Sequence, residues 1–191
     1  MAENKVRFGL KNVYYAVLTE GATNSWETPV AVKGAVAITL DDNSTSTPFY
    51  ADNITYYRTF ANNGYSGSLE MALIPESMLA DIWGIEEDST SKVIYEKTGT
   101  QPKPFALLFE VDGDQDSELN VLYRVLPTSK PNAGSSTIED TPTPVTQTFN
   151  FEALPLVTGS ASQQGLIKAR TAADTPTATR TSWFTAVNVP A

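Results

Sequence analysis

Carboxylates are the side chains of this sequence with the most scope for chemistry, because it contains no His and no Cys. That absence excludes an imidazole base, a His- or thiolate-ligated metal site, a thiol nucleophile and a disulfide framework. The densest carboxylate set alternates along one short segment: Asp112, Asp114, Asp116 and Glu118. A calcium-binding EF-hand loop that began at Asp112 would need Gly at its sixth position and Glu at its twelfth, where this chain has Ser117 and Tyr123. We interpret the segment as a solvated turn, with a fortuitous calcium site as the alternative, and predict no metal site.

The other carboxylate clusters, Asp41-Asp42 and Glu86-Glu87-Asp88, lie in predicted loops beside turns, where charge is simply solvated. A glycosidase would need two carboxyl groups about 5 to 10 Å apart with different pKa values, and the sequence identifies no such pair. The segment Gly64-Tyr65-Ser66-Gly67 has the wrong spacing for a phosphate-binding loop and is not followed by Lys. Asn62-Asn63-Gly64 is better interpreted as a turn between strands. We predict no catalytic residue, no cofactor and no enzymatic activity.

The charge balance restricts the partners. The chain holds 13 basic and 22 acidic residues, for a formal net charge of −9. Because neutralisation of phosphates dominates affinity for nucleic acid, we expect no tight binding to DNA or RNA. No apolar run approaches the roughly 20 residues that span a membrane, and the opening residues lack an apolar signal core. We therefore expect neither a membrane segment nor a secretion signal.

The 191 residues predict a single, mainly β domain. Short runs rich in Val, Ile, Tyr, Phe and Thr are separated by Gly and Pro, which is typical of antiparallel β structure. Segments 105–111 and 119–125 alternate in polarity around the acidic turn and predict a hairpin, and 67–74 and 145–154 predict further strands. The Pro-, Ser- and Thr-rich segment 127–144 predicts a mobile loop.

One short helix is predicted over residues 76–83. Pro75 precedes it and Gly84 follows it, as is usual at the start and end of a helix. Its apolar residues form one stripe, which consists of Met78, Leu79, Ile82 and Trp83. We expect this helix to lie against a sheet.

Two segments carry aromatic side chains with no obvious local cover. Segment 41–63 begins with a polar loop composition and continues with Phe49, Tyr50, Tyr56 and Tyr57, which are costly to leave in water. We interpret it as a long hairpin folded back on its own core; the alternative is an arm that packs on a neighbouring subunit.

The chain ends are expected to behave as arms. The C-terminal arm, about 171–191, contains the apolar residues Trp183, Phe184 and Val187, which need something to bury them. A flexible N-terminal arm is expected over about residues 1–8. Because the unusual residues lie in segments that look unable to pack locally, the sequence points to assembly.

The order and spacing of several short segments resemble the major tail protein family, the tail-tube subunits of long-tailed, non-contractile phages that infect Gram-positive bacteria. The matching segments extend over almost the whole chain: GLKNVYYA at 9–16, TPFYAD at 47–52, NNGY at 62–65, LE at 69–70, IP at 74–75, KPFALLFE at 103–110, DG at 112–113, LY at 122–123 and GLIKA at 165–169. None of them is a catalytic signature.

The resemblance implies an antiparallel β-sandwich or barrel-like fold with one short flanking helix and long extended loops. It also implies hexameric rings that stack into a tube, an inner β-barrel shared by all subunits around a DNA channel, and bridging of subunits by segment 41–63 and both termini. The implied partners are further copies of the chain, the tape-measure, tail-terminator and distal tail proteins, and DNA that passes through transiently without specific binding. The implied location is the virion tail, and the host cytoplasm during assembly.

Two sets of candidate residues follow from this interpretation. Contacts between subunits and rings are expected at Phe49, Tyr50, Ile54, Tyr56, Tyr57, Arg58, Trp183 and Phe184. The channel wall is expected on the polar faces of two strands, at Ser68, Glu70, Thr146, Thr148, Asn150 and Glu152, with an ordinary solvent-facing side as the alternative. An acidic or neutral wall would repel DNA phosphates, so that DNA slides past it.

Two other functions fit the same features. A tube subunit of a tailocin or gene-transfer agent belongs to the same structural class. A carbohydrate-binding or adhesin-like β-sandwich would instead hold exposed aromatic side chains on a rigid face and remain monomeric at high concentration.

Overall fold

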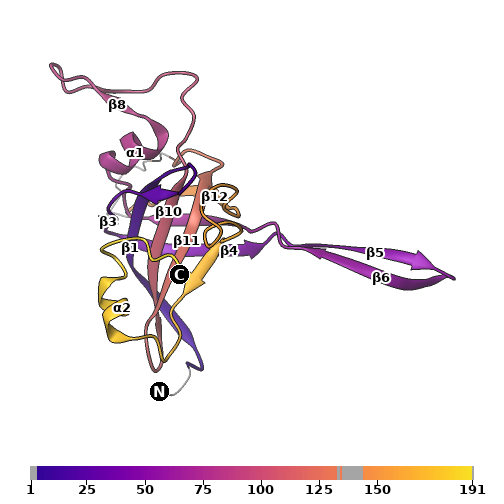
Figure 1. Cartoon of the computed structure of the whole chain (residues 1–191). Helices are drawn as coiled ribbons and strands as arrows, with labels where there is room; N and C mark the ends of the chain where they lie inside the picture. The colour runs from indigo at the N-terminus through magenta and orange to yellow at the C-terminus, as the bar shows by residue number, and fades with distance from the viewer. Residues whose placement is uncertain (1–3, 133, 135–143, 191) are drawn as a thin grey trace.

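The computed structural model describes residues 4–132, 134 and 144–190, and it is mainly β, as predicted (Figure 1). Its elements in chain order are β1 (Arg7–Thr19), β2 (Ser25–Trp26), β3 (Val30–Val32), β4 (Ala35–Asp42), β5 (Thr45–Ala51), β6 (Ile54–Ala61), β7 (Tyr65–Met71), α1 (Glu76–Trp83), β8 (Glu86–Glu87), β9 (Ile94–Tyr95), β10 (Phe105–Gly113), β11 (Glu118–Pro127), β12 (Gln147–Ala153), β13 (Lys168–Arg170) and α2 (Thr177–Ser182).

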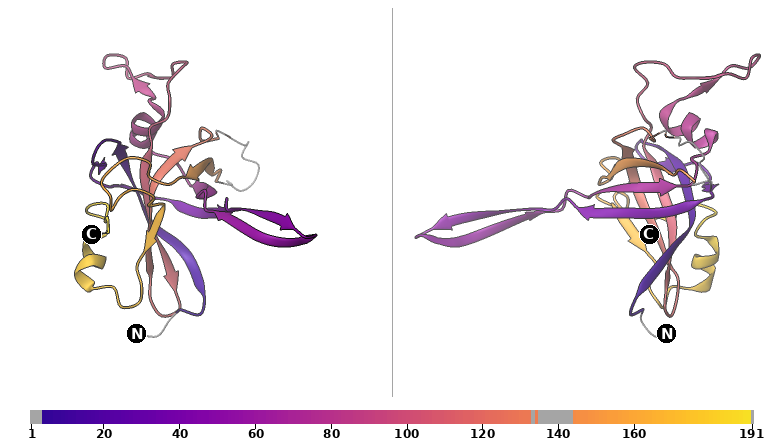
Figure 2. Two further views of the ribbon diagram at one scale, coloured as in Figure 1. Left: turned by 45° about the vertical axis from the view of Figure 1, so that its right-hand side comes forward. Right: turned by 180° about the vertical axis from the view of Figure 1, so that it is seen from behind.

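One large antiparallel sheet forms the body of the molecule. Within the described residues it contains nine strands in the order β2-β1-β10-β11-β12-β7-β4, with β13 paired to β11 and β3 paired to β1. Strands β4 and β7 run across β1, β10 and β11, so the sheet curls over its own inner face (Figure 1, Figure 2). The described strands do not close into a barrel. The predicted antiparallel sheet is confirmed, and the sheet ends at β4 without closure.

The inner core lies between the two parts of the curled sheet. Its largest buried side chains come from β1, β10, β12 and α1: Tyr15, Phe105, Phe149, Phe151 and Trp83. The rings of Trp83 and Phe149 meet edge to face, with 5.1 Å between centroids. This packing fixes α1 against the inner face of the sheet, as its apolar stripe predicted.

A second apolar cluster covers the opposite face of β1, β10 and β11. In β10, Ala106 and Leu108 point into this cluster, whereas Phe105, Leu107 and Phe109 point into the inner core. A strand that is buried on both faces needs apolar residues at every position, and this explains the unbroken apolar run at the start of β10.

The predicted alternation of β11 is wrong at Val125. The register of β10 against β11 shifts between Phe105 and Leu107, and β11 holds an extra residue there. A bulge of this kind reverses the side of the sheet to which the following residues point. Val125 therefore enters the inner core, while Tyr123 enters the second cluster.

Helix α1 occupies the predicted range and ends at Gly84, whose φ of 65° lies in the left-handed region. Helix α2 was not predicted, because its sequence, TATRTS, has no apolar stripe. A polar contact holds α2 to the body, since the Arg180 guanidinium lies 2.9 Å from the Asp116 carboxylate.

Residues 4–8 do not form a free arm. The Asn4 side-chain amide donates to the Asp116 carbonyl at 2.7 Å, and the Lys5 N–H donates to the Asp114 carboxylate at 2.7 Å. The prediction of a flexible N-terminal arm is therefore wrong for these residues, which are bound to the acidic turn. The same prediction for residues 1–3 lies outside the described residues.

The start of the predicted loop 127–144 extends the sheet. The Thr128 N–H donates to the Asn150 carbonyl at 2.9 Å, and the Asn132 N–H donates to the Thr148 carbonyl at 3.0 Å. Residues 128–132 therefore line one edge of β12. The prediction for 133 and 135–143 lies outside the described residues.

Two hairpins project from the body (Figure 1). Strands β5 and β6 pair only with each other and form a long extended hairpin, residues 45–61, which we call the arm. Strands β8 and β9, with the turn between them, form a smaller hairpin beyond α1, residues 86–95, which we call the flap. Every residue of β6 is exposed, so the interpretation of segment 41–63 as a hairpin folded back on its own core is wrong.

Candidate interaction surfaces

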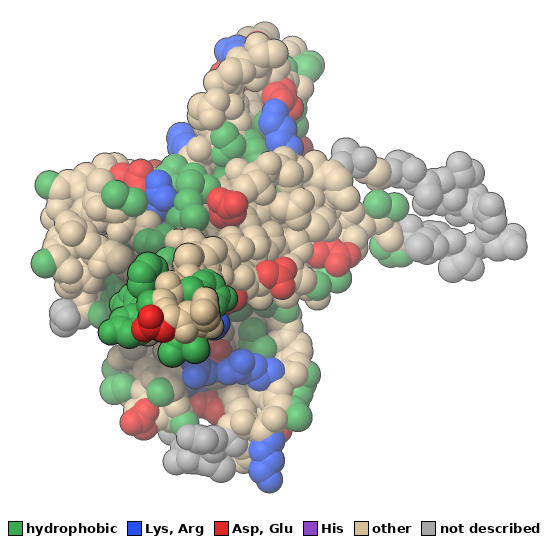
Figure 3. Space-filling view, turned by 90° about the vertical axis from the view of Figure 1, so that its right-hand side faces the viewer, with side chains coloured by type: hydrophobic (Ala, Val, Ile, Leu, Met, Phe, Trp, Pro, Cys, Tyr) green, Lys and Arg blue, Asp and Glu red, His purple; other side chains and the backbone are tan. Residues whose placement is uncertain are grey.

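The arm exposes large apolar side chains on both faces. Six of them are between 62% and 71% exposed: Phe49, Tyr50, Ile54, Tyr56, Tyr57 and Phe60. Consecutive residues of a strand point to opposite faces, so neighbouring aromatic residues place apolar surface on both sides. Figure 3 looks down the arm and shows apolar side chains gathered around its end. Exposed apolar surface of this density marks an interaction site.

Turn chemistry explains why the arm forms. Asp52 and Asn53, between the two strands, have φ values of 51° and 61°. A two-residue hairpin turn of type I′ requires this left-handed pair, and Asp and Asn tolerate it better than most residues. Behind the turn, the register shifts between Phe49 and Tyr50, which leaves Tyr56 of β6 without an opposite residue. The arm is therefore a paired and twisted ribbon.

A polar junction joins the arm to the hairpin formed by β4 and β7. The Asn43 N–H donates to the Gly64 carbonyl at 3.0 Å, and the Asn63 side-chain amide donates to the Asn43 carbonyl at 3.3 Å. Gly64 has a φ of +96°, and a Cβ at this position would clash with the Ala153 carbonyl oxygen. Asn62-Asn63-Gly64, predicted as a turn between strands, is instead the point at which β6 passes into β7.

The predicted arm contacts Phe49, Tyr50, Ile54, Tyr56, Tyr57 and Arg58 all lie on this exposed ribbon. Sequence reasoning missed Phe60, although it continues the same aromatic run and is 71% exposed. Its position in β6 became evident only with the pairing of Ser46 and Phe60.

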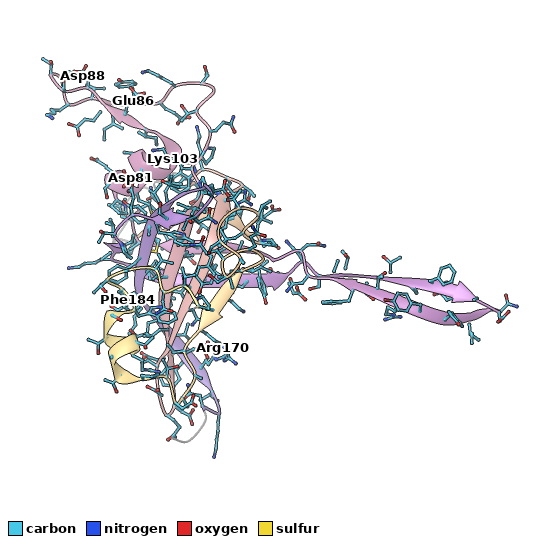
Figure 4. All side chains as sticks on the ribbon, in the orientation of Figure 1. Asp81, Glu86, Asp88, Lys103, Arg170 and Phe184 are labelled. Atoms are coloured by element: carbon cyan, nitrogen blue, oxygen red, sulfur yellow. The ribbon has the colours of Figure 1, made fainter. Side chains whose placement is uncertain are left out.

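The predicted C-terminal contacts are covered by their own chain. Trp183 is 4% exposed, and its indole N–H donates to the Asn120 carbonyl at 3.4 Å. Phe184 stacks on Tyr14 with 4.7 Å between ring centroids, beside the body strands (Figure 4). The cover that these aromatic residues need comes from the second cluster of their own subunit. Their predicted contact with other subunits stays a prediction.

Strands β4, β7 and β12 present one polar face opposite the inner core. The register places Ser68 between Asn150 and Thr39, and it places Glu70 opposite Thr148. All the predicted channel-wall residues within β7 and β12 share this face, and Thr146, just before β12, donates to Glu70 at 2.6 Å. The structure therefore brings the predicted set together on one surface.

Strand β4 extends this polar face with residues that sequence reasoning missed. Thr39 and Asp41 lie opposite Ser68 and Ser66 of β7. In the described register the positions of this face are Ala37, Thr39, Asp41, Ser66, Ser68, Glu70, Thr148, Asn150 and Glu152. The charged side chains among them are three carboxylates and no cation, so the face is acidic.

Strand β4 also leaves one edge open. It pairs with β7 on one side, and on the other side it has no strand partner within the described residues. The unpaired N–H and C=O groups of such an edge are a template for another strand.

The acidic turn is ion-paired and is not simply solvated. Lys11 lies 2.7 Å from Asp112 and holds the pKa of that carboxyl below its ordinary value. Arg7 and Arg170 both lie 2.8 Å from the same oxygen of Glu118. Among residues 4–132, 134 and 144–190, no group of three or more carboxylates is arranged to hold a metal ion.

In the part of the chain that the structure describes, no helix is both long and apolar enough to cross a membrane. In comparisons with known proteins, no family model matches the chain and no curated protein matches it significantly. Its function is therefore inferred from the arm, the acidic face and the open edge.

Proposed function

We propose that this chain is a tail-tube subunit of a long-tailed, non-contractile phage and assembles into stacked hexameric rings that form a conduit for DNA. The observation that carries the proposal is the arm, whose large apolar side chains have no cover from their own subunit. Burying one such side chain is worth about 1.5–3 kcal/mol. An isolated two-stranded hairpin is marginally stable in water, and packing on a neighbouring copy stabilises it.

The open edge of β4 supports ring formation. A neighbouring copy that pairs with this edge satisfies backbone groups that are otherwise left to water. A contact between two different surfaces of identical copies closes into a ring when its rotation permits. The sixfold number comes from the sequence resemblance, and the curled, unclosed sheet is compatible with a barrel completed between subunits.

The acidic face of β4, β7 and β12 supports a channel wall. Its carboxylates, Asp41, Glu70 and Glu152, are repeated in every copy, and its register positions hold no cation. Such a surface repels DNA phosphates over about 8–10 Å at physiological salt. A basic wall would instead retain DNA through counterion release.

We propose the remaining partners on the basis of the same sequence resemblance. They are the tape-measure, tail-terminator and distal tail proteins, with the protein located in the virion tail and, before assembly, in the host cytoplasm. A tailocin or gene-transfer agent would use the same tube, and neighbouring capsid and terminase genes would distinguish these particles.

Removal of the arm tests the proposal. Deletion of residues 45–61 joins Ser44 to Asn62. Asn43 and Gly64, on either side of this join, already share a hydrogen bond, so the body should fold unchanged. We expect the intact protein to form hollow tubes or six-lobed rings at high concentration in electron micrographs, and the deletion variant to remain a folded monomer. Normal tubes from the variant would refute a role for the arm. An intact protein that stays monomeric and binds sugars would favour the carbohydrate-binding alternative.

Charge reversal at Glu152 tests the channel wall separately. Glu152→Lys should permit assembly but slow the passage of DNA, measured as ejection kinetics. Unchanged kinetics would remove Glu152 from the wall while leaving the tube proposal intact.

A further inference from the structure

A small groove lies between α1 and the flap. Its volume is about 280 Å³, close to the lower limit of about 300 Å³ for ligand pockets, so it accepts one or two side chains and not a whole strand. Leu79, Ala80, Ile85 and Ile94 form its apolar lining, with Glu76 and Glu86 among its acidic residues. The groove therefore suits an apolar side chain that is accompanied by a cation.

The carboxylates of this groove differ in their availability. Glu86 accepts hydrogen bonds from Lys97 at 2.8 Å and Tyr95 at 2.7 Å, and these contacts lower the pKa of Glu86. On the same flap, Glu87 pairs with Lys92 at 2.8 Å. Glu86 lies on the flap near α1, whereas Asp88 lies toward its far end (Figure 4).

Among the carboxylates of the groove, Glu76 is the one that can pair with a cation of another molecule. It begins α1 and has no hydrogen-bond or ion-pair partner within the part of the chain that the structure describes. A cation supplied by another molecule can therefore pair with it without displacing an internal contact.

The middle of the arm has the complementary chemistry. Arg58 is the only basic residue between positions 45 and 61, and it also has no ion-pair partner among the described residues. It lies opposite Pro48, in the fourth of the seven cross-strand pairs. Phe60, two residues further along β6, shares its face and is 71% exposed. The arm thus presents one cation beside an exposed aromatic side chain.

The two surfaces lie on different sides of the molecule. The arm projects sideways from the body, and α1 with the flap lies at the top of the body (Figure 1, Figure 2). Copies that share one orientation can therefore bring the arm of one to the groove of the next. Repetition of such a contact produces an open stack.

We propose that the groove between α1 and the flap receives the middle of the arm of the next copy, with an apolar side chain in the groove and Arg58 paired with Glu76. This inference rests on the proposed function, because it names the site that covers the arm when rings stack.

Chemical cross-linking tests the contact, since the chain contains no Cys and every thiol would be an introduced one. The arm variant Thr59→Cys, at an exposed position next to Arg58, is mixed with the groove variant Ile94→Cys, assembled, and treated with a short bifunctional maleimide. Val157→Cys, exposed at 72% and outside the groove, is the matched control partner. Electron microscopy of each mixture before cross-linking establishes whether tubes are present.

We expect tubes in both mixtures and covalent arm–groove dimers only with Ile94→Cys. Tubes that give no Ile94 cross-link, or as much Val157 cross-link, would overturn the groove assignment and leave the proposed function standing. A protein that forms no tubes, with or without the introduced thiols, would overturn the proposed function and the groove with it.

A charge exchange provides the second test. Arg58→Glu and Glu76→Arg should each reduce tube formation, and the double variant should restore it, because the pair is re-formed with opposite polarity. Tubes at the wild-type level in both single variants, or no recovery in the double variant, would show that these two residues do not meet.

Discussion

The arm and the C-terminal segment both carry aromatic side chains, but only those of the arm remain exposed to water. In the arm, Tyr56 and Phe60 are each 71% exposed, whereas Trp183 of the C-terminal segment is 4% exposed. The C-terminal segment returns across the outer face of β10 and β11 and completes a core there. The arm leads away from the body, and its strands pair only with each other. Aromatic residues outside the predicted strands thus indicate apolar surface that must be buried. They do not indicate whether the same subunit or another molecule buries it.

The geometry of the connections explains the difference. The arm continues straight from the β4–β7 hairpin through the Asn43–Gly64 junction, and a β-ribbon has no means of folding back without a break in pairing. The C-terminal segment leaves β13 as irregular chain and is held by separate contacts, including the hydrogen bond from the Tyr123 hydroxyl to the Asn188 carbonyl at 2.8 Å.

Truncation of Trp183 should give the largest effect on the stability of a single subunit. Trp183→Ala leaves a cavity in the second cluster and should lower the free energy of unfolding by about 3–5 kcal/mol. Urea denaturation followed by far-ultraviolet circular dichroism measures the loss. A change below about 1 kcal/mol would contradict burial of Trp183 within its own subunit.

Substitution at the arm junction should have the next largest effect. Gly64→Ala forces a side chain into left-handed backbone and against the Ala153 carbonyl, which should cost about 1–3 kcal/mol. Gly99→Ala is the matched control, because Gly99 also has a positive φ, +84°, but a Cβ there would meet nothing within 4 Å. Equal losses in the two variants would show that the junction is not tightly packed.

Alkaline pH should weaken the attachment of the C-terminal segment. Burial raises the pKa of Tyr123 to about 12, from an ordinary value of 10.0. Between these values the unfolded chain loses the phenolic proton and the folded chain keeps it, so this contribution to stability is complete below pH 10 and falls as pH rises toward 12.

Burial, reinforced by the 2.7 Å hydrogen bond to Asp81, also raises the pKa of Tyr15 to about 12. Tyr15 should therefore contribute to the same alkaline decline in stability.

Tyr123→Phe should lower the free energy of unfolding by about 1 kcal/mol at neutral pH, because the Asn188 carbonyl loses its donor. The substitution should also make the alkaline decline in stability shallower. Denaturation curves at neutral pH and above pH 10 measure both effects. An unchanged alkaline slope would exclude Tyr123 as a source of the decline.

Truncation in the arm should have the smallest effect on an isolated subunit. Tyr56→Ser removes an exposed ring and should change the free energy of unfolding by less than about 0.5 kcal/mol, measured in dilute solution. A larger loss would indicate that the arm folds onto its own body, and the contrast with Trp183 would disappear.

Much of the fold was predictable from local pattern. Pro75, the apolar stripe and Gly84 indicated α1, and the alternation of β7 and β12 predicted which residues face the core. The polar face of these strands was predicted for the same reason. Helix α2 was not, because an ion pair with Asp116 holds it to the body and its own sequence carries no apolar stripe.

The candidate surfaces were only partly predictable. The aromatic residues of the arm were identified, but their exposure depends on where β4 and β7 direct the ribbon. The contribution of Thr39 and Asp41 to the acidic face required the register of β4 against β7, and the groove required the flap to lie beside α1.

Several properties of this protein are already present in its amino-acid sequence: no His or Cys, an excess of carboxylates, strand-forming periodicity, and more aromatic residues than nearby segments could cover. These properties belong to individual residues and their near neighbours. The tertiary structure alone decided which aromatic cluster stays in water, which sheet edge stays open and which carboxylates share a face. Those outcomes depend on contacts between residues far apart in the chain, and local periodicity does not specify such contacts.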